Sequence, residues 1–118
     1  MKLALNQANV SLGNTKENPS VGCIIIKNNS VIGAGKTSFS GRPHGEINAI
    51  NFSKANLKNS ILYVTMEPCS HYGKTPPCVN SIIQKKIKKV FFSVNDPDIR
   101  SNKKCKTKLN KRKILVNQ

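Results

Sequence analysis

The amino-acid sequence predicts one α/β domain in which a mixed sheet of about five strands lies between layers of helices. Short β-branched runs alternate along the chain with segments whose apolar residues recur every three or four positions. This alternation is typical of a three-layer α/β/α domain. The length of 118 residues suffices for one hydrophobic core and is too short for two, so we expect residues 1–118 to form a single domain.

The N-terminal part is predicted to form a helix followed by a β-hairpin. Residues 21–27 are a nearly continuous β-branched run, as in a strand that is covered on both faces. Asn28-Asn29 then predicts a turn into a second strand at 31–34. The preceding helix should end near Gly13, and its apolar face is predicted to consist of Met1, Leu5, Ala8 and Leu12.

The rest of the chain is predicted to alternate between helices and strands. Prolines precede two of the helices, which suits the first turn of a helix. In chain order we expect a helix at 44–55, a buried strand at 61–66, a helix with Val79, Ile82, Ile83 and Ile87 on one face, a strand at 89–95, a weaker helix at 102–110 and a last strand at 113–116.

The strongly basic composition does not by itself indicate a nucleic-acid partner. The formal charge is +15, and twelve of the twenty Lys and Arg residues lie between Lys85 and Lys113. Only three of the twenty are Arg, and aromatic residues make up 5% of the chain, so the groups that read or stack on bases are scarce. We therefore expect solvated helix faces rather than a nucleic-acid interface.

The chain carries no signal for a membrane or for export. No apolar run approaches the roughly 20 residues that cross a bilayer, and the apolar start of the chain gives way at once to Asn6 and Gln7. We expect a cytoplasmic protein whose cysteines stay reduced and free for metal binding or catalysis. Of these, Cys23 is predicted to be a small buried hydrophobe and Cys105 a free surface thiol among lysines.

Two motifs together predict a catalytic zinc site. His44-Gly45-Glu46 begins a predicted helix, and the segment 66–78 holds Cys69 and Cys78. A structural zinc is usually closed by four protein ligands, whereas a catalytic zinc has three and keeps one position open. His, an unbound Glu, a Pro-Cys pair and a second Cys form the signature of zinc deaminases, although eight residues rather than two separate the cysteines here.

The chemistry that this residue set implies is hydrolytic deamination of an aminated heterocycle. Zinc lowers the pKa of a bound water molecule to about 7. Glu46 lies two residues after His44, so both side chains reach one cavity only near the start of the helix. There the carboxylate accepts the water's proton, passes it to a ring nitrogen and later protonates the departing ammonia.

Other interpretations of the same residues remain open at this point. An isolated His-x-Glu triplet is common, and two cysteines eight residues apart also occur as redox pairs. His71, as a fourth ligand, would convert the site into a closed Cys2His2 structural zinc. Since His71 is only two residues from Cys69, such a chelate would be strained.

The sequence resembles the deaminase domain of the bifunctional riboflavin biosynthesis deaminase/reductase, diaminohydroxyphosphoribosylaminopyrimidine deaminase. The resemblance covers nearly the whole chain and rests on four segments, 18–23, 43–49, 63–78 and Asp96-Pro97-Asp98. The long cysteine loop separates this family from cytidine, deoxycytidylate and tRNA adenosine deaminases, whose two cysteines usually stand two residues apart.

The resemblance implies a cytidine deaminase-like fold, a homo-oligomer and a hydrolase that acts on the C–N bond of a cyclic amidine. The substrate would be the pyrimidine ribotide 2,5-diamino-6-(5-phosphoribosylamino)pyrimidin-4(3H)-one, and the product 5-amino-6-(5-phosphoribosylamino)uracil. One Zn²⁺ per chain would be held by His44, Cys69 and Cys78, with Glu46 as proton shuttle. The implied substrate contacts are Asn18, Lys74, Asp96, His71 and Asp98, of which Lys74 suits the phosphate. The alternatives are a deaminase of the cytidine, deoxycytidylate or tRNA type and a non-catalytic zinc module that binds nucleic acid.

Four features depart from the family pattern. Gly45 stands where relatives usually carry Ala, which costs up to about 1 kcal/mol of helix propensity. Thr37 stands where many carry a substrate-contacting His, and Asn102-Lys103-Lys104 replaces a glycine-containing segment. The sequence ends at Gln118, where the family normally continues into a reductase. A free-standing deaminase, an excised domain and a relic of the pathway are all consistent with this pattern.

Overall fold

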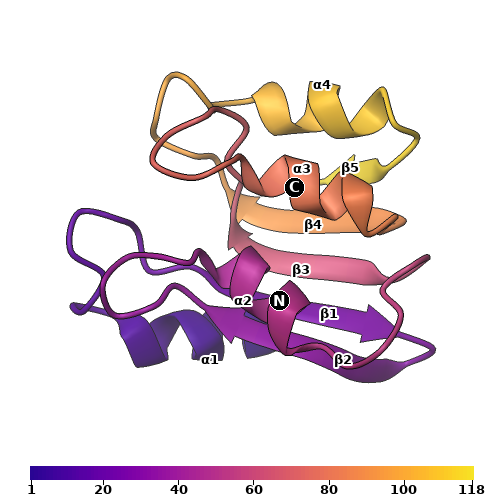
Figure 1. The fold of residues 1–118 in the computed structure, drawn as a ribbon, viewed down its shortest axis with the longest axis horizontal. Coiled ribbons are helices and arrows are strands. Elements are labelled where there is room, and N and C mark those ends of the chain that lie inside the picture. Colours follow the sequence, from indigo (N-terminus) through magenta and orange to yellow (C-terminus); the bar gives the residue numbers. More distant parts are fainter.

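A five-stranded mixed sheet forms the centre of the computed structural model, which describes all 118 residues (Figure 1). The strands lie in the order β2-β1-β3-β4-β5. Their bounds are β1 Gly22–Lys27, β2 Ser30–Lys36, β3 Ile61–Met66, β4 Lys89–Val94 and β5 Leu115–Asn117. The helices are α1 Lys2–Ser11, α2 Gly45–Phe52, α3 Cys78–Gln84 and α4 Lys104–Asn110. The predicted α/β class and the predicted order of elements are confirmed.

The sheet combines an antiparallel and a parallel half. β1 pairs antiparallel with β2 and with β3, whereas β3, β4 and β5 run parallel. The predicted hairpin is confirmed, because Asn28 and Asn29 adopt φ angles of 50° and 60°, as the favoured two-residue hairpin turns require. The parallel strands are joined through α3 and α4, so the loops that leave β3 and β4 emerge at the same edge of the sheet.

Helices cover both faces of the sheet. α1 packs on the face that contains Gly22, and α2 packs on the opposite face, where Cys23 and Gly35 are paired. In the view of Figure 1, α2 and α3 cross the front of the sheet. A single core of 17 buried residues, among them Ile25, Leu62 and Val90, lies between the sheet and α2, α3 and α4. No helix in the structure has the length and apolar character to cross a membrane.

The first helix is confirmed, and of its predicted apolar face only Ala8 is buried. The buried residues of α1 are Ala4, Ala8 and Ser11. A Cβ on Gly22 would lie 1.9 Å from the Ala4 carbonyl oxygen, so α1 approaches β1 so closely that only small side chains fit between them. The large residues predicted to face the core remain at the surface, with exposed fractions of 38%, 47% and 70% for Met1, Leu5 and Leu12.

Two helices end earlier than their apolar spacing predicts. α2 ends at Phe52 rather than at 55, because Ser53 turns to extended dihedral angles. α3 ends at Gln84, and Lys86 adopts a left-handed φ of 56°. The N–H of Ile87 then donates to the carbonyl of Ile82, which is the bond of a Schellman motif. Ile87 is therefore buried against the helix without being part of it, which explains its helical spacing.

The C-terminal elements differ in detail from the prediction. The last strand is Leu115–Asn117 instead of 113–116, since Lys113 still belongs to the turn after α4 and has a φ of 60°. Cys105 is fully buried, so the expectation of a surface thiol is wrong. It lies in the first turn of α4 and points into the core, while the lysines around it are exposed. Cys23 is buried, as predicted.

Replacing Lys103 by Gly should stabilise the fold. Lys103 precedes α4 and has a φ of 60° and a ψ of 9°, a left-handed conformation that is costly for residues with a Cβ. Because glycine adopts this conformation freely, we expect Lys103→Gly to raise the free energy of unfolding by up to about 1 kcal/mol. Urea unfolding followed by circular dichroism measures the change.

Lys106→Gly is the matched control, since Lys106 is an exposed residue inside α4. There glycine should lower the free energy of unfolding by about 1 kcal/mol. If both variants were destabilised equally, the left-handed conformation of Lys103 would carry no strain.

Candidate metal centre

A polar cavity of about 350 Å³ opens at the edge of the sheet where the parallel strands β3 and β4 end. Its walls come from the loop before β1, the start of α2, the long loop between β3 and α3, and the segment that follows β4. Ligand sites of α/β proteins generally lie at the carboxyl ends of parallel strands. The cavity is thus the place in this fold where the side chains of the two motifs meet.

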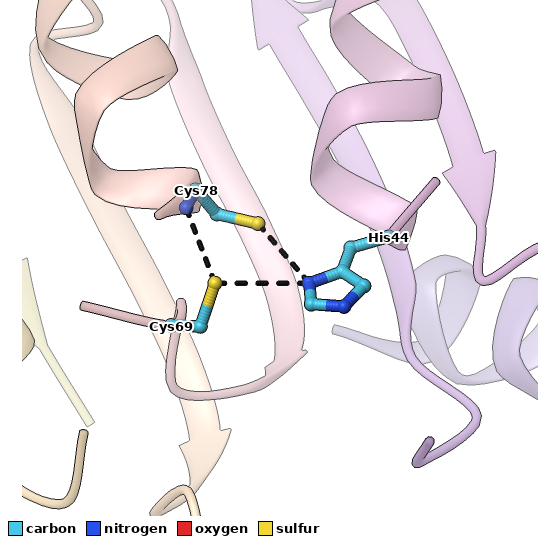
Figure 2. Close-up of side chains that lie close together, drawn as sticks. All are labelled: His44, Cys69 and Cys78. Atoms are coloured by element: carbon cyan, nitrogen blue, oxygen red, sulfur yellow. Dashed lines mark hydrogen bonds between the residues drawn. The ribbon is translucent and has the colours of Figure 1, made fainter. Parts of the chain in front are cut away.

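His44, Cys69 and Cys78 converge from three separate elements (Figure 2). His44 is the residue before α2, Cys69 lies in the loop after β3, and Cys78 is the first residue of α3. His44 Nδ1 lies 3.7 Å from Cys69 Sγ and 3.4 Å from Cys78 Sγ. All three potential ligand atoms lie within 4.8 Å of one another.

The spacing and chemistry of this donor set fit zinc. In a tetrahedral site with Zn–S near 2.3 Å and Zn–N near 2.0–2.1 Å, sulfur and nitrogen are about 3.6 Å apart. The observed separations of 3.4 and 3.7 Å lie on either side of that value. One imidazole and two thiolates form a ligand set that binds zinc in preference to the hard cations Mg²⁺ and Ca²⁺, which favour oxygen ligands.

Cys69 is poised to bind as a thiolate, whereas Cys78 holds its proton until a metal binds. The pKa of Cys69 is lowered to about 4, mainly by a hydrogen bond from the Cys78 thiol. Hydrogen bonds from His44 and from the Cys78 backbone N–H lower it further. The Cys78 backbone N–H donates to Cys69 Sγ at 3.2 Å. The same thiol pairing, together with burial, raises the pKa of Cys78. The metal-free pair therefore shares one negative charge, and metal binding releases the second proton.

His71 is not part of the cluster. Its Nδ1 lies 2.6 Å from Ser101 Oγ, and its Nε2 lies 3.6 Å from Asp98 Oδ2. Both ring nitrogens thus face other partners, and three protein ligands remain around the candidate zinc position. This arrangement matches the open site of a catalytic zinc rather than the closed Cys2His2 site.

Glu46 lies beside the cluster as the second residue of α2. Its side chain lines the cavity, yet the residue is only 3% exposed. Burial is the main cause that raises the pKa of Glu46 to about 7, and the negative Cys69 adds to it. A carboxyl group with a pKa near 7 both accepts and donates protons at neutral pH.

Gly45 allows α2 to bring His44 and Glu46 close to β1. A Cβ on Gly45 would lie 2.5 Å from the carbonyl oxygen of Val21 and 3.4 Å from the N of Thr37. The glycine therefore permits close packing at this point, although it lowers the helix propensity of α2.

All five residues expected to contact the substrate line the cavity, namely Asn18, Lys74, Asp96, His71 and Asp98. Burial raises the pKa of Asp96, whereas hydrogen bonds from Arg100 hold the pKa of Asp98 below its usual range. Asp96 Oδ1 accepts the N–H of Asp98 at 2.9 Å, so the two carboxylates form one wall.

Thr37 also lines the cavity, but its hydroxyl group is engaged in hydrogen bonds with the backbone. Thr37 Oγ1 accepts the N–H of Val21 at 3.0 Å and donates to the carbonyl of Pro19 at 3.0 Å. The hydroxyl thus holds the loop that carries Asn18.

Sequence reasoning missed Arg42, Arg100 and Glu67 among the residues that line the cavity. Arg42 Nη1 donates to Thr75 Oγ1 at 2.5 Å and lies 3.3 Å from His44 Nε2. Its position two residues before His44, in a chain with only three arginines, was the available signal.

Comparison with known proteins agrees with this geometry. Residues 1–94 match the family described as the cytidine and deoxycytidylate deaminase zinc-binding region. The chain is 44% identical over 102 residues to the diaminohydroxyphosphoribosylamino-pyrimidine deaminase of Buchnera aphidicola subsp. Schizaphis graminum, covering 86% of this chain and 69% of that protein. It is 44% identical over 98 residues to riboflavin biosynthesis protein RibD of Bacillus amyloliquefaciens, covering 83% of this chain and 26% of RibD.

A solved RibD structure from Acinetobacter baumannii superposes with a TM-score of 0.92 at 36% identity, covering 98% of this chain and 33% of that one. The chain thus spans between a quarter and a third of these RibD proteins and about two thirds of the Buchnera deaminase. It belongs to the cytidine and deoxycytidylate deaminase zinc-binding family and, within it, to the diaminohydroxyphosphoribosylaminopyrimidine deaminases, with His44, Cys69 and Cys78 as its zinc-binding cluster.

Proposed function

We propose that the chain removes the 2-amino group of 2,5-diamino-6-(5-phosphoribosylamino)pyrimidin-4(3H)-one by hydrolysis of its C–N bond. This reaction is a step of riboflavin biosynthesis. The observation that carries this proposal is the three-ligand cluster with the unbound Glu46 beside it, both at one polar cavity. The match to a deaminase named for this pyrimidine, which extends over two thirds of that protein, supports the choice of substrate.

In the reaction a C–O bond forms at the pyrimidine carbon and the C–N bond to the amino group breaks. Zinc held by His44, Cys69 and Cys78 would act as a Lewis acid, which lowers the pKa of a bound water molecule to about 7. The Glu46 carboxylate accepts a proton from the attacking water and delivers it to the neighbouring ring nitrogen. The carboxylate then takes the proton of the new hydroxyl group and passes it to the amino group, which leaves as ammonia while the ring carbon becomes a carbonyl. Burial of Glu46 excludes bulk water from these transfers.

The rest of the cavity suits a polar, anionic ribotide. Asn18, Asp96 and Asp98 offer an amide and two carboxylates to the amino and hydroxyl groups of the pyrimidine and ribose. Lys74 and Arg42 both line the cavity and carry positive charge, which favours the phosphate. Thr75 holds Arg42 in place through its hydroxyl.

Lys74→Ala should raise KM for the ribotide about ten- to a hundredfold, the equivalent of a hydrogen bond to a charged group. The KM for the dephosphorylated nucleoside analogue should change little, because that analogue lacks the group that Lys74 binds. Steady-state kinetics on both compounds measures the two effects.

Lys54→Ala removes an exposed lysine outside the cavity and is the matched control, with both KM values expected to stay at the wild-type level. Equal losses on the two compounds in Lys74→Ala would show that Lys74 does not contact the phosphate.

A substrate panel tests the proposed function. Ammonia release is measured with the zinc-loaded chain on the ribotide, cytidine, deoxycytidylate and a tRNA anticodon stem. We expect turnover on the ribotide and far less on the others. Preferred turnover of one of the others would reassign the substrate. Absence of turnover on all four, together with RNA binding that weakens about a thousandfold between roughly 50 and 200 mM salt, would indicate a nucleic-acid-binding zinc module instead.

A further inference from the structure

The Glu67 carboxylate is buried and fully engaged with backbone donors. Glu67 follows β3 and is only 3% exposed. Its Oε2 accepts the N–H of Asp96 at 3.2 Å and of Lys103 at 2.9 Å, and its Oε1 accepts the N–H of Cys105 at 3.1 Å. Burying a carboxylate is costly unless its oxygens find donors, and three backbone donors meet that need here.

These three donors all belong to the segment that follows β4. Residues 96–105 carry Asp96, Asp98 and Arg100, which form one wall of the cavity. Glu67 itself lies two residues before the zinc ligand Cys69, and its own N–H donates to the carbonyl of Val94 at 2.8 Å. One side chain thus connects the loop that holds the metal ligand with the wall that faces the substrate.

Two successive hydrogen bonds link Glu67 to Asp96 and Asp98, the carboxylates of the cavity wall. Glu67 binds the backbone N–H of Asp96, and Asp96 Oδ1 accepts the N–H of Asp98. Asp98 in turn binds Arg100, with Arg100 Nε at 2.9 Å from Oδ1, and lies 3.6 Å from the ring of His71. A shift of the Asp96 backbone would therefore move both carboxylates relative to the zinc cluster.

We propose that Glu67 is a positioning residue for substrate binding, because its carboxylate sets the distance between the Asp96–Asp98 wall and the zinc-binding loop. This role rests on the proposed function in one respect, namely that Asp96 and Asp98 contact the ribotide. Although Glu67 borders the cavity, both of its carboxylate oxygens accept backbone N–H groups. It acts only through the backbone of residues 96–105.

A second attachment keeps this segment folded when Glu67 is changed. Ser101 is fully buried, its Oγ accepts the N–H of Ser70 at 3.0 Å, and Lys108 donates to the carbonyl of Ser70. Loss of the Glu67 bonds should therefore loosen the wall without detaching it.

Glu67→Gln tests the proposal, since Gln has the same shape but only one acceptor oxygen. Its amide NH₂ must face at least one of the three backbone N–H groups and leave it unpaired. We expect amide hydrogen exchange at Asp96, Lys103 and Cys105 to accelerate at least about tenfold relative to amides in β3. Zinc should stay at one per chain, and KM for the ribotide should rise about tenfold, as for the loss of one such bond, with kcat nearly unchanged.

Ile25→Val is the matched control, because it removes one methyl group from the core in β1, away from this segment. It should lower stability by about 0.5–1.5 kcal/mol without selective exchange at the three amides and without a change in KM. If Glu67→Gln does not fold, Glu67→Asp provides the same readouts, since it keeps both acceptor oxygens but withdraws them by one methylene, and we expect a smaller rise in KM.

Unchanged exchange at the three amides, or an unchanged KM beside accelerated exchange, would overturn the proposal. The exchange measurement does not require turnover. If the wild-type chain were inactive on the ribotide, that result would count against the proposed function, and selective loosening in Glu67→Gln would still support the link between Glu67 and the backbone of residues 96–105.

Discussion

Glu46→Gln should lower the rate of deamination by at least about a thousandfold, while zinc content and fold remain those of the wild type. Gln keeps the shape of the side chain but can neither accept nor release a proton at neutral pH. General acid–base catalysis is usually worth about a hundred- to ten-thousandfold, and the proposed mechanism assigns several transfers to this one carboxylate, so the loss should lie in the upper part of that range. Ammonia release, zinc analysis and circular dichroism on the same preparation measure the three quantities.

Glu17→Gln provides the control, since Glu17 is an exposed carboxylate that lines the same cavity. This change should lower the rate of deamination far less. Turnover of Glu46→Gln within about tenfold of the wild type would assign the proton transfers to another residue, with His71 as the next candidate. Loss of zinc together with activity would make Glu46 a ligand or a structural support.

His44→Ala, Cys69→Ser and Cys78→Ser should each lose zinc and, with it, activity. Each change removes one of only three protein ligands, and the two that remain form too weak a chelate. His71→Ala should keep one zinc per chain, because the His71 ring nitrogens face Ser101 and Asp98 rather than the cluster. Metal analysis of the purified variants after dialysis measures the stoichiometry.

The four variants together distinguish an open from a closed site. If His71→Ala emptied the site as completely as the three ligand variants, His71 would be a fourth ligand. The zinc would then be structural, and no position would remain for a water molecule.

Much of the fold could be predicted from the sequence because its strands are marked locally. The run at 21–27 and the Asn28-Asn29 turn define the hairpin through β-branching and turn chemistry alone. Residues 61–66 are strand β3 as predicted. The cluster of His44, Cys69 and Cys78 could also be predicted, since residue type and spacing alone identify three metal ligands.

Features that depend on close tertiary contact could not be predicted in this way. The buried face of α1 consists of small residues because Gly22 lets the helix approach β1, and periodicity alone favoured the leucines. Cys105 looked exposed because its neighbours are lysines, yet it points into the core. Glu67 binds residues 29 to 38 positions further along the chain, and no local pattern reports such bonds.

The most direct test of the central claim is the mass of the product that the zinc-loaded wild-type chain forms from the ribotide in ¹⁸O-labelled water. Hydrolytic deamination predicts a uracil product with one ¹⁸O at the new carbonyl and one ammonia released for each product molecule. Product formation should cease when zinc is removed by a chelator and return when zinc is restored. Unlabelled product, or no product from a chain that holds one zinc, would contradict the account.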